Sequence, residues 1–265
     1  MTDQNISPAG SDVTVPSPAR VYDYLLGGKD NYPVDRAVAE RLLAVAPDTR
    51  SVARASRAFL VRAVRYLAAE AGVRQFIDLG TGIPTSPSVH EVARETDGSI
   101  RVVYADNDPL VKVHNDARLG ADAGVITLRA DVRRPEAILG DPAVQKLIDF
   151  SRPIAVLFIG VLHFVSDDED PSGVLAAFRD RMAPGSHLVI SHTSSDSDPA
   201  AIKELTAATA GTPARSTFRS REEILALFDG FQLLPPGLVP VQHWRAEREA
   251  ATTRLNIPAG VGRKA

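Results

Sequence analysis

The chain has 265 residues, of which 44% are hydrophobic and 24% are charged, a composition typical of a folded globular protein and inconsistent with general disorder. Its 30 Lys and Arg residues against 33 Asp and Glu residues give a net charge of -3, so we expect no overall electrostatic attraction to nucleic acid or anionic membranes. The absence of cysteine excludes disulfides and thiolate metal sites, and no histidine pair has metal-ligand spacing, so no metal is expected.

The first 16 residues, MTDQNISPAGSDVTVP, lack the basic stretch and apolar core of a secretory signal. We expect residues 1–16 to form a flexible tail. No apolar run approaches the roughly 20 residues that cross a bilayer as a helix, so no membrane contact is expected. A cytoplasmic location is the default for such a chain, and the absence of cysteine fits a reducing compartment.

Residues 17–72 are predicted to form a helical cap ahead of the core. ARVYDYLLGG (19–28) stops at two glycines, PVDRAVAERLLAVAP (33–47) is bounded by prolines, and a longer helix runs from Asp48 as N-cap to Gly72. A polar and aromatic cluster surrounds the double glycine. It either folds over a ligand as a lid or packs within a helix-loop-helix cap. The lid candidates are Tyr22, Lys29 and Tyr32.

Residues 73–265 alternate between apolar strand segments and amphipathic helices, which predicts an α/β core with a parallel sheet covered on both faces. Residues 17–265 are expected to form one structural domain, because a chain of 265 residues fits one large α/β domain with additions better than two independent domains. The fully apolar PIAVLFIG is typical of a central strand, placed next to the first. The predicted strands are residues 75–79, 101–106, 125–129, 153–160 and 187–192, and the predicted helices are residues 89–94, 109–119, 174–185 and 220–230.

The C-terminal part of the core is predicted to be antiparallel. The last helix has a capping-box start, with Ser220 three residues before Glu223. FQLL (231–234) and LVPVQHW (238–244) are short strand-like segments on either side of a turn. We expect them to close the sheet as an antiparallel hairpin.

The stretch FIDLGTG (76–82) carries the strongest functional signal. A buried strand ends at the acid Asp78, and Gly80 and Gly82 allow the chain to turn sharply and approach a ligand closely. The next strand, RVVYAD, ends in Asp106, where a Rossmann-like fold holds a ribose. An ordinary strand-to-helix turn is the alternative. Together the two acids favour a nucleoside-bearing cofactor, because buried acids need partners.

Two further side chains follow strands of the same sheet. Asp131 comes after VITLR and either contacts the cofactor or caps the helix that begins near Pro135. His163 follows the fourth strand, near the expected ligand crevice. It either accepts a proton from a substrate or makes local hydrogen bonds in its turn.

The ordered segments FIDLGTG, VVYADND, LRADV, VLFIGVLHF and MAPGSHLVIS resemble the class I S-adenosylmethionine-dependent methyltransferases. With ARVYDYLLGGKDNYPVDR and FIDLGTGIPT, the chain is similar to the actinobacterial S-adenosyl methyltransferase family, many of whose members lack an assigned substrate. The resemblance implies a Rossmann-like three-layer sandwich and S-adenosylmethionine as cofactor. One departure is Pro84, where such enzymes often have a third glycine.

The resemblance also implies roles for residues around the cofactor. The loop residues Gly80, Thr81 and Gly82 would line its methionine part, and Asp78 would orient that loop or meet the amino group. Asp106 would hold the ribose. Adenine would meet Asp131 and the main chain of Val132, and the pocket walls would be formed by Asn107 and Ile159.

We therefore expect methyl transfer to a small-molecule acceptor, which the sequence does not identify. One alternative is a regulator that senses the cofactor without transferring its methyl group. A second is an NAD-dependent dehydrogenase, but its G-x-G-x-x-G fingerprint would need glycine where Thr85 stands. The oligomeric state is not readable from the sequence.

Overall fold

The computed structural model of the chain describes residues 12–119, 122–210, 215–247 and 251–265. The strands are β1 (Gln75–Leu79), β2 (Arg101–Asp106), β3 (Val125–Arg129), β4 (Ala155–Ile159), β5 (His187–Ser191), β6 (Phe231–Leu233), β7 (Val239–Pro240) and β8 (Pro258–Lys264). The helices are α1 (Pro18–Leu26), α2 (Pro33–Val45), α3 (Thr49–Ala69), α4 (Val89–Arg94), α5 (Pro109–Leu119), α6 (Pro135–Leu139), α7 (Pro142–Leu147), α8 (Pro171–Arg181), α9 (Pro199–Thr209) and α10 (Arg221–Ala226). Across these ranges, none of the helices has both the length and the apolar character needed to cross a bilayer.

The strands of these ranges form one sheet in the order β3-β2-β1-β4-β5-β8-β6, with β7 paired to β8. Strands β1 to β5 are parallel. The predicted placement of the fourth strand beside the first is confirmed by the register of Leu79 with Phe158. Because β1 lies between β2 and β4, the chain builds the sheet outward in both directions from β1. Such a switch point is where open α/β sheets bind ligands.

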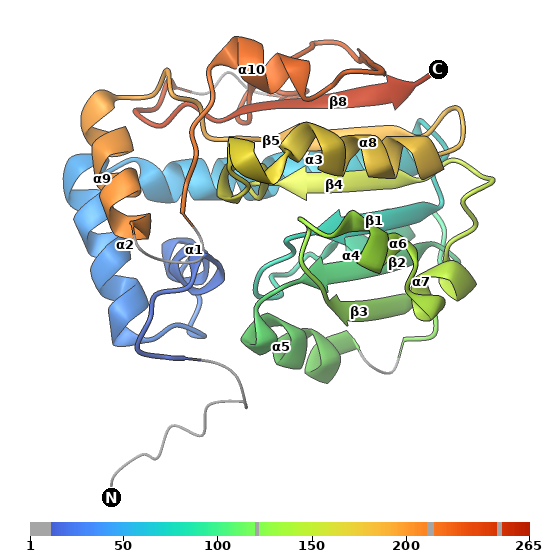
Figure 1. Ribbon diagram of the computed structural model, residues 1–265, viewed down its shortest axis with the longest axis horizontal. Helices are drawn as coiled ribbons and strands as arrows, with labels where there is room; N and C mark the ends of the chain where they lie inside the picture. The colour runs from blue at the N-terminus through green and yellow to red at the C-terminus, as the bar shows by residue number, and fades with distance from the viewer. Residues whose placement is uncertain (1–11, 120–121, 211–214, 248–250) are drawn as a thin grey trace, which may run out of the picture.

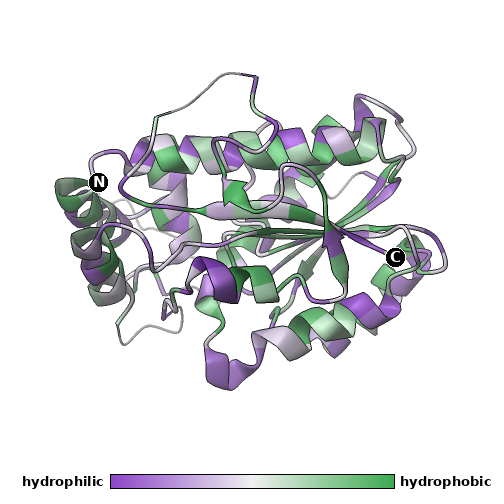
Figure 2. Cartoon of the chain, turned by 90° about the horizontal axis from the view of Figure 1, so that it is seen from above, coloured by the Kyte–Doolittle hydropathy of each residue, from purple (hydrophilic) through white to green (hydrophobic). Residues whose placement is uncertain are grey.

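Helices cover both faces of the sheet, which gives the expected three layers (Figure 2). Neighbouring β1 residues point to opposite faces, so Phe76 packs with α3 and α4, whereas Ile77 packs with α6, α8 and α10. Figure 2 shows the apolar residues concentrated along the sheet between the helix layers. Burial of these two apolar faces is the main force that holds the layers together.

The helices α1, α2 and α9 lie beyond the carboxyl ends of the parallel strands, at the left of Figure 1. Leu25, Ala39 and Ala53 pack α1, α2 and α3 against one another. The predicted cap is therefore present, and α9 adds to it. The boundary between cap and core at residues 72 and 73 stays a prediction, as does the flexible tail, of which residues 1–11 lie outside the described residues.

The C-terminal antiparallel addition is confirmed, but its pairing differs from the prediction. The segments β6 and β7 do not pair with each other. Both pair with β8, which also pairs antiparallel with β5. The sequence of β8, PAGVGRK, lacks the alternating apolar pattern of a strand, and its main-chain pairing between β5 and β6 determines its conformation.

Two predicted helix starts can be compared with the structure. The capping box of α10 is confirmed, because the Ser220 hydroxyl accepts from Glu223 N and Ser220 N donates to the Glu223 carboxylate. Asp48 occupies the N-cap position of α3, but its side chain makes no capping hydrogen bond. Instead, its Oδ2 accepts from Arg254 N. Asp48 therefore connects the cap to the segment before β8.

Candidate functional site

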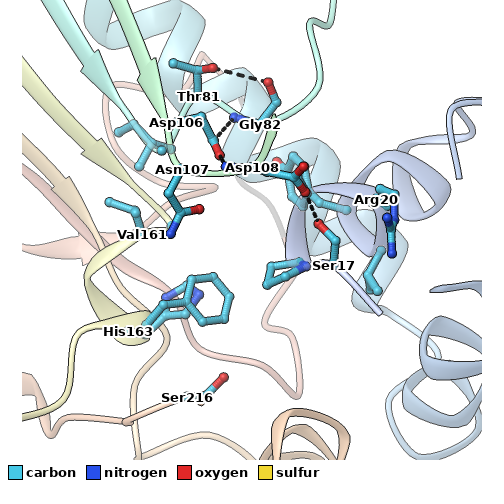
Figure 3. Close-up of a pocket in the computed structure, with 18 of the residues that line it drawn as sticks. Ser17, Arg20, Thr81, Gly82, Asp106, Asn107, Asp108, Val161, His163 and Ser216 are labelled. Atoms are coloured by element: carbon cyan, nitrogen blue, oxygen red, sulfur yellow. Dashed lines mark hydrogen bonds between the residues drawn. The ribbon is translucent and has the colours of Figure 1, made fainter. Parts of the chain in front are cut away.

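A cavity of about 590 Å³ opens where the carboxyl ends of the parallel strands meet the helical cap. This volume lies within the ~300–1,000 Å³ typical of ligand pockets. Figure 3 shows side chains from the strand ends on one side of the cavity and from α1 on the other. The sequence-predicted residues that line it are Tyr22, Asp78, Gly80, Thr81, Gly82, Asp106, Asn107, Asp131, Val132, Ile159 and His163.

The loop after β1 turns sharply at its two glycines. Gly80 and Gly82 both have a φ of 65°, a left-handed conformation that favours glycine. A Cβ on Gly80 would lie 2.4 Å from Val161 Cγ2, whereas a Cβ on Gly82 would have no atom within 4 Å. Between them, Thr81 accepts from Asn115 Nδ2 at 3.3 Å. The loop thus lies close to the segment after β4 and open toward the cavity.

Asp106 stands at the end of β2 and organises the neighbouring loops. Its Oδ2 accepts from Gly82 N at 2.9 Å, and its Oδ1 accepts from Asp108 N at 2.9 Å. Only 8% of the residue is exposed. Burial raises the pKa of Asp106 to about 6 despite these hydrogen bonds. A ligand that donates hydrogen bonds or brings positive charge would favour the ionised carboxylate.

Asp78, at the end of β1, lines the same cavity, but its carboxylate accepts no hydrogen bond from the described residues. Burial raises the pKa of Asp78 to about 7, and the nearby Asp106 adds to this effect while Arg57 opposes it. A buried acid without a partner is unfavourable in its charged form. The site therefore favours a cationic or hydrogen-bond-donating guest near Asp78.

Arg57 of α3 is a site residue that the sequence analysis missed. Its Nη2 donates to the main-chain oxygens of Thr85 and Pro87, whereas its Nε is buried without a hydrogen-bond partner. It lines the cavity beside the glycine loop. The sequence of α3 contains five arginines, and nothing local shows which of them faces the cavity.

Asp131 is held by an arginine rather than by a helix terminus. The Arg133 guanidinium donates to both Asp131 carboxylate oxygens and also pairs with Glu169. The N-cap of α6 is Arg134, so the alternative of Asp131 as a helix cap is wrong. Although burial acts to raise it, the hydrogen bonds from Arg133 hold the pKa of Asp131 below its usual range. Asp131 is thus ionised at neutral pH.

The His163 side chain forms part of the cavity wall after β4. Its ring packs against Phe164, with centroids 4.3 Å apart, and its Nδ1 is buried without a partner. Burial lowers the pKa of His163 well below 6.5, and the nearby His192 and Arg219 contribute to this shift. The imidazole is therefore neutral at pH 7. A neutral imidazole can accept a proton, although a low pKa makes it a weak base.

Arg219, which the sequence analysis did not single out, fixes the turn that carries His163. Its guanidinium donates to the main-chain oxygens of Leu162 and Val165, to Asp167 and to His192 Nε2. His192 also hydrogen bonds to the Thr193 oxygen through Nδ1. Both His192 nitrogens are thereby used within the protein, so His192 has a structural role.

The three lid candidates lie in different places. Tyr22 lines the cavity, and its hydroxyl donates to the Ala53 oxygen at 2.9 Å. Lys29 is exposed and does not line the cavity. Tyr32 also lies away from it, because its ring packs beside Ile83 and under the Arg20 guanidinium. Only Tyr22 therefore reaches the site.

The start of α1 is tied to the strand ends by polar contacts that the sequence did not indicate. The Ser17 hydroxyl donates to Asp108 Oδ2 at 2.7 Å, and Ser17 N donates to Asp35 Oδ1 at 2.9 Å (Figure 3). Arg20 pairs with the other Asp35 oxygen at 2.9 Å, and both side chains are buried. These contacts hold α1 against the loop after β2, across the cavity from His163.

Known proteins resemble this chain over nearly its whole length. The structure of a Thermobifida fusca protein proposed to be a methyltransferase is 41% identical, covers 98% of this chain and 99% of its own, and has a TM-score of 0.92. A DUF574 family protein from Streptomyces avermitilis is 33% identical, with coverages of 96% and 99% and a TM-score of 0.91. An O-methyltransferase family protein from Burkholderia thailandensis shares the fold at 16% identity, with coverages of 94% and 71% and a TM-score of 0.52. A comparison with curated proteins found no match.

The fold and the cavity define a class I, Rossmann-like methyltransferase. The chain belongs to the S-adenosyl methyltransferase family, which it matches over residues 4–265. S-adenosylmethionine is the cofactor of this family, and the cavity fits its chemistry. Such a cofactor carries positive charge and hydroxyl donors that would favour the ionised forms of the buried Asp78 and Asp106, and its carboxylate would suit the unpaired, buried Nε of Arg57. Within the described ranges, no group of three or more His, Asp or Glu residues could hold a metal ion.

Proposed function

We propose that this protein transfers a methyl group from S-adenosylmethionine to a small molecule that enters the same cavity. The observation that carries the proposal is the shared lining: Gly80, Asp78, Asp106 and His163 all border one cavity. Membership of the S-adenosyl methyltransferase family supports methyl transfer over hydride transfer. The proposal names the methyl acceptor only by its class, a small molecule.

When bound, the cofactor supplies a methyl group on a positively charged sulfur, which already makes it an activated donor. The contribution of the protein is then to align the two reactants and exclude water, an effect that can supply several kcal/mol. The Arg57, Asp78 and Gly80 region would hold the methionine end. The Asp106 carboxylate would accept hydrogen bonds from the ribose.

The adenine end is assigned to Asp131 and to the main chain of Val132, with Asn107 and Ile159 as walls. Arg133 keeps the Asp131 carboxylate ionised and oriented. A charge-assisted hydrogen bond from the exocyclic amine of adenine would suit such an acceptor. Asp131 would then accept from the amine and from Arg133 at the same time, which its lone pairs allow.

His163 is proposed to accept a proton from the acceptor when the methylated group carries one. Its neutral state and its place in the cavity wall support this role. Methyl transfer to a group without a proton would need no base, and His163 would then only shape the wall. Tyr22 is proposed as the one lid contact among the three candidates.

The test is formation of S-adenosylhomocysteine, measured by mass spectrometry with and without each member of a panel of small-molecule acceptors. Acceptor-dependent product supports the proposal. Cofactor binding without product across the panel would favour a regulator that senses the cofactor. In a parallel calorimetric titration, tighter binding of NAD than of S-adenosylmethionine would contradict the proposal.

We also propose a cytoplasmic location and no nucleic-acid partner. The absence of cysteine fits a reducing compartment such as the cytoplasm, and the net charge of -3 gives no overall attraction to nucleic acid. Fractionation of the native cells with an antibody against the chain tests the location. Recovery in the membrane or secreted fraction would contradict it.

A further inference from the structure

The cavity continues beyond the cofactor residues into the helical cap. Its lining there comes from α1, α2, α3 and the segment before β8, and it is mainly aliphatic. We call this part of the cavity the cap compartment. The apolar side chains that define it are Val21, Leu25, Leu42, Val52, Leu60 and Ile257.

The buried charge at the cap compartment and two of its hydroxyl groups are already paired within the protein. Arg20 forms its buried ion pair with Asp35, and the hydroxyl of Tyr22 donates to a main-chain oxygen of α3. The hydroxyl of Thr49 likewise donates to a main-chain oxygen, at 2.7 Å. Apart from Arg20, the charged residue among the described ones that line the cap compartment is Asp12, which lies exposed at its rim. An ionised ligand group deep in the compartment would find no free counter-charge.

The cofactor half of the cavity has the opposite character. Asp78, Asp106 and Asp131 border it, together with Arg57 and Arg133. Charged side chains are thus concentrated where a charged cofactor is proposed to bind. The cap compartment, in contrast, offers no unpaired charged side chain in its interior among the described residues. The boundary between the two halves runs past His163, which Figure 3 places on the side of Val161 and across from Ser17 and Arg20.

We propose that the cap compartment binds the methyl acceptor and that this acceptor is a neutral, largely apolar molecule with its reactive group directed toward His163. The inference rests on the proposed function and adds the substrate class to it. Apolar surface is favourably buried against such a lining, whereas an unpaired charge is not. Phe164 and Phe218 border the same region and offer flat surfaces to an aromatic acceptor.

The experiment compares two fluorescent probes of nearly the same shape. N-phenyl-1-naphthylamine is neutral, and 8-anilino-1-naphthalenesulfonate carries a sulfonate. Each is titrated into the full chain with and without saturating S-adenosylhomocysteine. We expect one saturable site for the neutral probe in both conditions, with at least tenfold weaker binding of the anionic probe. Equal affinity of the two probes, or no saturable binding of the neutral probe, would overturn the inference.

A matched pair of variants locates the probe. Val21→Glu introduces a charge into the cap compartment from a half-buried position, and Val113→Glu introduces the same charge on α5 at a side chain that is 47% exposed. We expect Val21→Glu to weaken binding of the neutral probe at least tenfold and Val113→Glu to change it less than twofold. The affinity for S-adenosylhomocysteine should change less than twofold in both variants. A folded Val21→Glu variant, judged by circular dichroism, that binds the probe as the wild type does would overturn the inference. Failure of the wild type to bind S-adenosylhomocysteine would instead contradict the proposed function alone.

Discussion

Two buried carboxyl groups at neighbouring strand ends make the free protein sensitive to pH. Burial raises the pKa of Asp78 to about 7 and that of Asp106 to about 6, from 3.8 in both cases. The folded chain therefore holds protons that the unfolded chain has released. Stability contributed by these groups is present below 3.8 and is lost as the pH rises to about 7.

The first prediction concerns Asp78, whose carboxylate has no hydrogen bond to lose. Asp78→Asn removes a buried charge and should raise the free energy of unfolding of the free protein by on the order of 1–3 kcal/mol near pH 8. The gain should be smaller near pH 5, because the wild-type carboxyl is protonated there. Urea unfolding at both pH values measures it. The control is Asp229→Asn, at a side chain that is 88% exposed. If Asp78→Asn raised the free energy of unfolding equally at both pH values, the charge of Asp78 would not be the cause.

The second prediction concerns His163. With an acceptor in hand that loses a proton, His163→Gln should lower turnover by a factor of roughly 10²–10⁴, the range of a lost general base. Cofactor affinity should change less than twofold. Because the pKa of His163 lies well below 6.5, its neutral form dominates between about pH 6 and 8. Titration of His163 should therefore cause no change of turnover with pH in that range. Full turnover in the variant would leave His163 as a wall residue only.

At the scale of elements, the loop after β1 carries a matched pair of glycines. Gly80→Ala combines a positive φ with a Cβ 2.4 Å from Val161, whereas Gly82→Ala has the same φ and open space. The backbone strain alone costs about 1–2 kcal/mol. We therefore expect Gly80→Ala to lower the free energy of unfolding more than Gly82→Ala does. Equal losses in denaturant titrations would mean that Val161 moves aside without cost.

Most elements were predictable because their local pattern and their tertiary role agree. The five parallel strands are short segments rich in apolar residues, and α10 begins with a capping box that the structure contains. The strand β8 was missed because glycines and charges dominate PAGVGRK, and its conformation depends on partners far away in the sequence. The start of α9 carried a usable signal, since Asp198 caps it and Pro199 follows.

At the scale of the whole molecule, the side of the cavity formed by the strand ends was predictable from the sequence. The opposite side, formed by the helical cap, was not. Asp78 and Asp106 lie at the carboxyl ends of neighbouring parallel strands, so the topology alone brings them to one edge. Arg57 lies in α3 and Ser17 directly precedes α1, two helices whose orientation depends on packing within the folded chain. Their distance from the strand ends along the sequence hides their part in the site. Lys29 and Tyr32 lie close in sequence to the double glycine but do not line the cavity, which fits the alternative of a helix-loop-helix cap at these two positions.

The central claim is that one cofactor binds to the glycine loop, Asp78 and Asp106 together. Calorimetric titration of S-adenosylmethionine into the wild type, Asp106→Ala and the exposed control Asp229→Ala tests it most directly. We predict one cofactor per chain for the wild type and the control, and affinity weaker by roughly 1–3 kcal/mol for a folded Asp106→Ala variant. Absence of binding to the wild type, or unchanged affinity in Asp106→Ala, would contradict the claim.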